Sequence, residues 1–168
     1  MRGLLQFIHI NLNDIAMPYS KRCITSAVAG VLLLLGAPQV LAQLKSDAVL
    51  IEAAKEPDAK VTASGLVIRM LKEGKGAQPN VASTVKVHYK GTFPDGKEFD
   101  SSYKRGEPIE FPLTGVIKCW TEGVALMKVG GTAKLTCPSS IAYGARGAGG
   151  VIPPNATLVF EVELLGVR

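Results

Sequence analysis

The 168-residue chain has few of the side chains on which most enzymes depend. It contains two histidines, three cysteines and one tryptophan, and no pair of cysteines has CxxC spacing. Structural zinc sites and thiol–disulfide enzymes both rely on such pairs, so neither is expected. Aromatic residues make up only 6% of the chain, yet hydrophobic residues reach 47%, which is enough for a folded core. The length suits one domain with extensions.

The motifs of the common enzyme classes are missing as well. From Gln43 onward the only histidine is His88, and no GxSxG segment accompanies it, so Ser-His-Asp chemistry is disfavoured. The glycine-rich stretch 144–150 leads to Pro153-Pro154 and not to a helix, so it does not match a dinucleotide-binding motif. We expect no cofactor and no bound metal.

The first 42 residues have the layout of a secretory signal peptide. Lys21-Arg22 precede an apolar run at 27–35, and small residues follow up to Ala42. This layout predicts export to the periplasm with cleavage after Ala42. The run is shorter than the ~20 residues of a membrane-spanning helix, so an uncleaved anchor is the weaker alternative. Because residues 1–16 fit no basic leader, we expect translation to start at Met17.

The net charge of +5 does not indicate a nucleic-acid partner. Three of the 19 Lys and Arg and one of the 14 Asp and Glu lie in residues 1–42, so the remaining chain carries +3. Its basic residues are scattered among acidic ones and form no stripe. We expect an ordinary solvated surface, no nucleic-acid binding, and no stable membrane span after cleavage.

The rest of the chain divides into a polar segment and a β-rich domain. Residues 43–63 have an apolar stripe too narrow to hold a core, which predicts a linker or a short helix. Residues 64–168 contain one helix candidate, at 116–127, and five strand signals: 66–71, 85–90, the segment after the turn Pro94-Asp95-Gly96, 133–137 and 158–164. This pattern predicts an α+β domain in which an antiparallel sheet wraps around one short helix.

Six aromatic residues lie beside turn-rich loops: Tyr89, Phe99, Phe111, Trp120, Tyr143 and Phe160. Taken singly, each would be a core residue. Two positions favour a binding site instead. Trp120 lies near the start of the predicted helix, and Tyr143 lies in a loop beside Gly144, where a side chain with a free hydroxyl is more expected to bind than to fill a core.

Several separated motifs together resemble the FKBP-type peptidyl-prolyl cis-trans isomerases, the rapamycin-binding immunophilins. In chain order they are Val87–Gly91, Asp95–Ser102, Val116-Ile117 with Trp120–Gly123, Ala142–Gly144 and Ile152–Phe160. The resemblance covers about Ser64–Arg168. It implies an antiparallel sheet of five to six strands curled around a short helix, with a hydrophobic pocket between helix and sheet.

The resemblance also implies which residues form that pocket. The substrate-binding residues would be Tyr89, Phe99, Val116, Ile117, Trp120, Tyr143, Ile152 and Phe160, and the catalytic ones Asp100, Phe99 and Tyr143, with Arg105 behind Asp100. Three positions depart from the family pattern. Ile109 stands where an aromatic residue is common, Gly115 where a Glu is common, and Cys119 where a Gly is common. These departures concern ligand preference more than activity.

The activity implied by the resemblance is rotation about X-Pro peptide bonds in exported proteins as they fold. The barrier of ~18–20 kcal/mol comes from amide resonance, and no bond is broken, so no nucleophile or metal is required. A pocket that removes water and fits the twisted amide lowers the barrier by differential binding. The expected partners are proline-containing unfolded or peptide chains, and rapamycin-like macrolides are expected to bind.

Two alternatives stay open. The same pocket could hold proline-containing or unfolded segments as a chaperone does, with little turnover. Separately, loss of Cys23 with the signal peptide would leave Cys119 and Cys137 as the only pair, and these could form a disulfide in an oxidising compartment. The other reading of that pair is two small buried thiols that fill the core.

Overall fold

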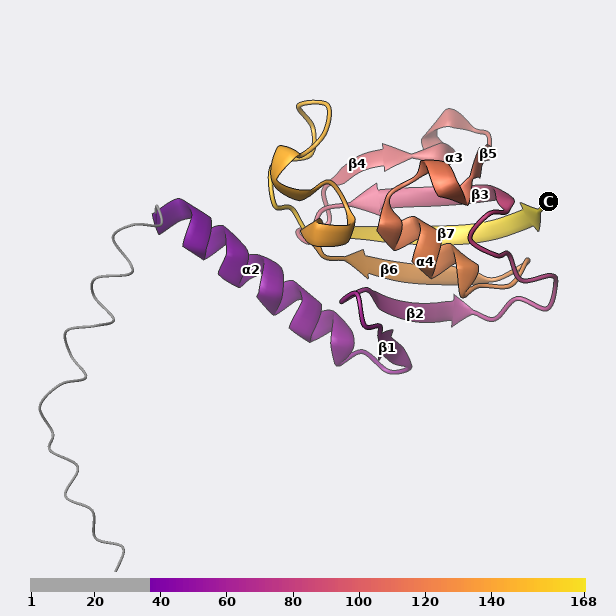
Figure 1. The fold of residues 1–168 in the computed structure, drawn as a ribbon, viewed down its shortest axis with the longest axis horizontal. Coiled ribbons are helices and arrows are strands. Elements are labelled where there is room, and N and C mark those ends of the chain that lie inside the picture. The colour runs from indigo at the N-terminus through magenta and orange to yellow at the C-terminus, as the bar shows by residue number, and fades with distance from the viewer. Residues whose placement is uncertain (1–36) are drawn as a thin grey trace, which may run out of the picture. The chain divides into compact units, whose positions relative to one another are not determined.

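A computed structural model describes residues 37–168 (Figure 1). Residues 1–36, with Met17 and most of the predicted signal peptide, lie outside the described residues. The predicted cleavage point after Ala42 falls within helix α2, Ala37–Ala54. Among the helices of residues 37–168, none combines the length and the apolar character that crossing a bilayer requires.

The described residues form one antiparallel sheet of seven strands, in the order β1-β2-β6-β7-β3-β4. The remaining strand, β5, and β4 pair with successive parts of the same edge of β3. The bounds are β1 Ala59–Val61, β2 Val67–Lys72, β3 Thr84–Thr92, β4 Glu98–Ser101, β5 Ile109–Pro112, β6 Thr132–Cys137 and β7 Leu158–Val167. The predicted fold class is confirmed. The strand number exceeds five or six because the sheet also includes β1 and β5, of three and four residues.

Alternation of apolar and polar residues explains the central strand β3. Val85, Val87 and Tyr89 are buried, whereas Lys86 and Lys90 between and after them are exposed. The strand leads into the predicted Pro-Asp-Gly turn, which Phe93 closes by donating its N–H to the carbonyl of Lys97 at 2.8 Å. Gly96 has a φ of +85° there, which only glycine adopts without strain.

Helix α4, Lys118–Ala125, is the main helix on the core face of the sheet (Figure 1). Its buried residues include Cys119, Trp120 and Val124, so the helical spacing predicted for 116–127 is confirmed over a shorter range. The helix lies close to β6 at Gly123, where a Cβ would come within 2.8 Å of the Leu135 Cδ2 atom. The smaller helical segments are α3 Ser102–Arg105, η1 Leu113–Gly115, η2 Ser139–Ile141 and η3 Gly144–Arg146.

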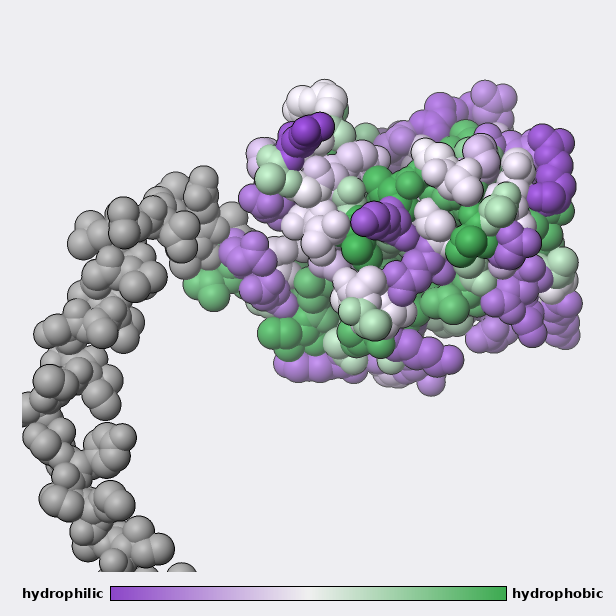
Figure 2. Space-filling model, in the orientation of Figure 1, coloured by the Kyte–Doolittle hydropathy of each residue, from purple (hydrophilic) through white to green (hydrophobic). Residues whose placement is uncertain are grey.

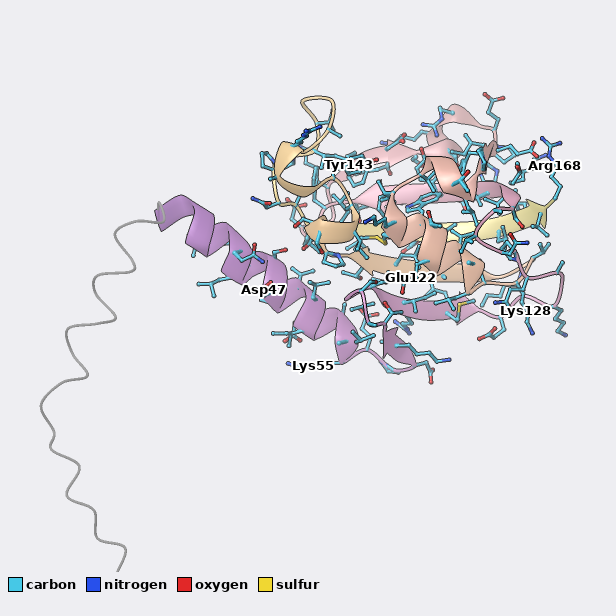
Figure 3. The ribbon with its side chains drawn as sticks, viewed as in Figure 1. Asp47, Lys55, Glu122, Lys128, Tyr143 and Arg168 are labelled. Atoms are coloured by element: carbon cyan, nitrogen blue, oxygen red, sulfur yellow. A yellow bond between two sulfur atoms is a disulfide. The ribbon has the colours of Figure 1, made fainter. Side chains whose placement is uncertain are left out.

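A disulfide joins Cys119 of α4 to Cys137 at the end of β6, and Figure 3 draws it as a yellow bond. The two Cα atoms are 5.8 Å apart, within the range that disulfides span. Both side chains are fully buried. Of the two alternatives for this pair, the structure therefore has the crosslink and not two free thiols.

Polar contacts attach helix α2 and the residues just after it to the opposite face of the sheet. Glu56, just after the helix, accepts hydrogen bonds from Arg69 on β2 at 2.9 Å and Lys134 on β6 at 2.6 Å. The neighbours of Lys134 along β6 are buried on the α4 side, so Lys134 itself points to the other face. Farther up the helix, Ser46 makes a buried hydrogen bond with Thr157.

Glu56→Gln is expected to lower the free energy of unfolding by about 1 kcal/mol at neutral pH, the size typical of partly exposed ion pairs. Hydrogen bonds from Lys134 and Arg69 lower the pKa of Glu56 below its ordinary 4.5. A lowered pKa stabilises the fold above the unfolded value, and this contribution is lost as the pH falls. The difference between wild type and variant should therefore shrink toward zero below pH 4.5.

Chemical denaturation over a pH series measures this difference. Glu52→Gln is the matched control, because the Glu52–Lys55 ion pair is exposed and should contribute almost nothing. A Glu56→Gln variant as stable as wild type at neutral pH would contradict the attachment.

Candidate functional site

A pocket of about 300 Å³ lies between α4 and the sheet. Figure 2 shows apolar surface on the α4 side of the domain, with polar residues around it. The residues lining the pocket are Tyr89, Phe99, Asp100, Ile109, Phe111, Gly115, Val116, Ile117, Trp120, Tyr143 and Phe160. They come from β3, β4, β5, β7, α4 and the segments around it, so the pocket exists only once the sheet has curled around the helix.

The indole of Trp120 forms the floor of the pocket. Three rings surround it: Tyr89 at 5.2 Å and Phe160 at 5.3 Å lie edge-on, and Phe111 at 5.4 Å is tilted. Edge-to-face contacts at these distances suit the charge distribution of aromatic rings. The side chain is 5% exposed, and its Nε1 is the one fully buried side-chain nitrogen or oxygen without a hydrogen-bond partner among the described residues. Among the described residues, the contacts of the indole are therefore packing contacts.

Polar groups gather at one corner of the pocket rim. The Tyr89 hydroxyl donates a hydrogen bond to Asp100. Arg105 donates to the Asp100 Oδ1 atom at 2.5 Å and to the Tyr89 hydroxyl at 2.9 Å. Its guanidinium also lies 5.5 Å from the centre of the Tyr89 ring, a cation–π contact. The expected place of Arg105 behind Asp100 agrees with this geometry.

These contacts keep Asp100 ionised. Burial raises the pKa of its carboxyl, but the hydrogen bonds from Tyr89 and Arg105 together outweigh burial, so the pKa lies below its ordinary value. Burial, and then the charge of Asp100, raise the pKa of Tyr143. At neutral pH the rim thus presents a fixed negative charge and a phenol that keeps its proton. Neither group is poised to exchange a proton.

Phe99 forms one wall, and a glycine makes room for it. Its ring packs edge-on against Phe160 at 5.6 Å and is tilted against Phe93 at 5.1 Å. On the neighbouring strand, a Cβ at Gly91 would lie 2.6 Å from the Phe99 Cζ atom. Any larger residue at position 91 would push the ring out of this position.

Tyr143 lies on the loop after β6, where Figure 3 labels it. It directly precedes η3, and its side chain is 38% exposed. The ring lines the pocket while part of the side chain reaches solvent, which suits the predicted role of a binding residue with an available hydroxyl.

The structure brings together every predicted site residue except Ile152. Ile152 belongs to the buried core, and its backbone exchanges two hydrogen bonds of 2.9 Å with Ala148. Ile152 is not among the residues that line this pocket, and its role in substrate binding stays a prediction.

The sequence predictions omitted three lining residues, Ile109, Phe111 and Gly115. Phe111 was noted only as an aromatic beside a loop, and Ile109 and Gly115 only as departures from the family pattern. The alternation of Ile109, Glu110 and Phe111 is the signal that was available, because it places both apolar side chains on one face of a strand.

Comparison with known proteins connects this geometry to a family. A family model described as FKBP-type peptidyl-prolyl cis-trans isomerase matches residues 75–165. The chain is 62% identical over 103 residues to FK506-binding protein 1 of Dictyostelium discoideum, covering 60% of this chain and 96% of that relative. It is 55% identical over 115 residues to the FKBP-type peptidyl-prolyl cis-trans isomerase FkpA of Escherichia coli, covering 68% of this chain.

A solved structure agrees with the sequence comparisons. The crystal structure of a peptidyl-prolyl cis-trans isomerase from Pseudomonas syringae pv. tomato superposes with a TM-score of 0.74 at 37% identity. The match covers 80% of this chain and 98% of that one. The coverage differs for FkpA of Escherichia coli, where the chain spans only 42% of the relative's length.

Arg105→Leu is expected to raise the pKa of Asp100, because one of the two side-chain donors that oppose burial is lost. Carbon-13 NMR of the side-chain carboxyl over a pH series measures this directly. Lys104→Leu is the control: Lys104 pairs with Glu98, so the Asp100 titration should not move. An unchanged Asp100 pKa in Arg105→Leu would contradict the described rim.

Proposed function

We propose that this chain, which belongs to the FKBP-type peptidyl-prolyl cis-trans isomerases, accelerates rotation about X-Pro bonds in the pocket above Trp120. The observation that carries the proposal is the buried indole, surrounded by three aromatic rings at the base of a pocket whose polar groups gather at one corner of the rim. The proposal is supported because all but Ile152 of the residues that the sequence motifs assign to substrate binding are among those that line this pocket.

The physical basis is the polarity of the amide. A planar X-Pro amide is stabilised by resonance, which also makes its carbonyl and nitrogen polar and well hydrated. Halfway through rotation the resonance is lost and the group is less polar. An apolar pocket therefore disfavours the planar form more than the twisted one, and this difference lowers the barrier. An acceleration of ten-thousandfold requires only about 5–6 kcal/mol.

Individual groups have distinct tasks in this proposal. The indole of Trp120 with Val116 and Ile117 seats the proline ring. The Tyr143 hydroxyl and the Ile117 N–H hold the substrate carbonyls. Ile117 is the N-cap of α4, so its N–H takes no part in the hydrogen bonds of the helix. Asp100 lies at the rim, where its fixed charge orients the dipole of the amide beside it.

The substrates we propose are proline-containing unfolded or peptide segments of exported proteins, which the enzyme helps to fold in the periplasm. Two features support this location. Residues 1–42 have the predicted layout of a signal peptide. The Cys119–Cys137 disulfide is of the kind that persists in oxidising compartments such as the periplasm.

Phe99→Ala and Asp100→Ala are expected to lower kcat/KM for a short X-Pro peptide by tenfold or more, since each removes a contact beside the rotating bond, where small misplacements cost about 100-fold. Tyr143→Phe should weaken binding about fivefold, the equivalent of one hydrogen bond of ~1 kcal/mol. A protease-coupled or NMR isomerisation assay measures both. Equal rates for wild type and Phe99→Ala would refute the assignment of this pocket.

A macrolide of the rapamycin and FK506 class is expected to bind the same pocket and to inhibit isomerisation. Trp120 is the only tryptophan in the chain, so its fluorescence reports ligand binding at the pocket floor. Leu71→Ala, at an exposed position outside the pocket, is the control and should leave the affinity unchanged. Peptide binding without any acceleration of rotation would favour the holding role of a chaperone.

A further inference from the structure

The disulfide lies between two segments that supply the pocket. Cys119 is the second residue of α4 and directly precedes Trp120 at the floor. Cys137 ends β6, and the chain then passes through η2 to Tyr143 at the rim. The crosslink therefore ties the backbone next to the floor residue to the strand that leads to the rim residue.

Helix α4 is not able to hold its own position. It has only eight residues, and no side chain caps its N-terminus. Isolated helices of this length are marginal in water, so tertiary contacts must fix it. Four such contacts follow Trp120: Thr121 donates to the Leu113 carbonyl at 2.7 Å, Glu122 (labelled in Figure 3) accepts from Ser64 at 2.6 Å, Gly123 packs on Leu135, and Val124 is fully buried. Before Trp120, Val116 and Ile117 pack against the core, and the disulfide is the one covalent attachment.

The position of the Trp120 ring depends on the position of its backbone. Its Nε1 has no hydrogen-bond partner among the described residues, so no polar contact anchors the ring. The three edge and tilted contacts at 5.2 to 5.4 Å depend on where α4 places the Cα atom. A shift of the first turn would therefore move the floor of the pocket with it.

The crosslink is also out of reach of reductants in the folded protein. Both cysteines have 0% exposure. Thiol–disulfide exchange requires a thiolate to contact one of the sulfur atoms, so reduction needs α4 to open first. This burial favours a permanent structural role over a redox switch.

We propose that the Cys119–Cys137 disulfide is a positioning crosslink that sets the place of the Trp120 indole and thereby the affinity of the pocket for proline. The inference rests on the proposed function of this pocket. Cys119 and Cys137 act through Trp120 and do not touch the substrate. Without the crosslink the domain still folds, but the floor shifts and substrate binding weakens.

The test compares wild type with Cys119→Ala/Cys137→Ala and with Leu164→Ala. Leu164 is fully buried on β7 and does not line the pocket, so Leu164→Ala destabilises the core without touching the site. Each protein is assayed where far-UV circular dichroism shows it to be folded. The readouts are KM and kcat for an X-Pro peptide, the Kd of FK506, and the emission maximum of Trp120.

For the cysteine variant we expect KM and the FK506 Kd to rise about tenfold and kcat to change less, with a shifted Trp120 emission, because misplacement of a binding group acts on affinity. Leu164→Ala should stay close to wild type in all of these. Wild-type values in the cysteine variant, or equal losses in both variants, would overturn the inference. An inactive wild type that does not bind FK506 would instead overturn the proposed function.

A second variant protects the test against loss of folding. Cys119→Gly/Cys137→Val places the residue type common in the family next to Trp120 and a β-branched residue in the strand. If only this variant folds, we expect the same rise in KM and Kd from it. Wild-type KM and Kd values in this variant would overturn the inference. Intact mass before and after reduction verifies the crosslink in wild type.

Discussion

The structure depends on the placement of one indole that no hydrogen bond holds. Trp120 is enclosed by Tyr89, Phe111 and Phe160, which come from three different strands, and it is presented by a helix of only eight residues. The curl of the sheet brings the surrounding rings together, and glycines at positions 91 and 123 allow the close packing of Phe99 and of α4.

The charged groups of the site lie at the rim of the pocket, apart from its apolar floor. The contacts from Arg105 and Tyr89 keep Asp100 ionised, so its charge is available without proton exchange. The pocket therefore combines an apolar floor with one fixed charge at the rim. This combination suits a reaction in which an amide changes its polarity and no bond is made or broken.

Local patterns were enough to predict much of the fold. The alternation in Val85–Tyr89, the turn at Pro94-Asp95-Gly96 and the helical spacing around Trp120 each depend on neighbouring residues, and the structure has all three elements. The short strands β1 and β5 were missed because three or four residues carry too little periodicity. Their pairing is decided by the longer strands beside them.

Contacts that depend on loops or on residues far apart in the chain could not be predicted from the sequence. Ile152 is buried in a loop whose backbone pairs with Ala148, and such pairing leaves no trace in the order of side chains. The attachment of Glu56 to Lys134 joins residues 78 positions apart, so composition alone could not reveal it. The sequence offers the disulfide as one alternative, because loss of Cys23 with the signal peptide leaves a single cysteine pair. Choosing between a crosslink and two free thiols required the structure, in which the two Cα atoms are 5.8 Å apart.

The central claim is that this pocket turns the X-Pro bond by fit and desolvation, without transferring a proton. The most direct measurement is kcat/KM for one X-Pro peptide in H₂O and in D₂O, over the pH range in which Asp100 is ionised and Tyr143 is protonated. The account predicts the same value in both solvents and no change with pH across that range. A clearly slower reaction in D₂O would show a proton moving in the rate-limiting step and would contradict the account.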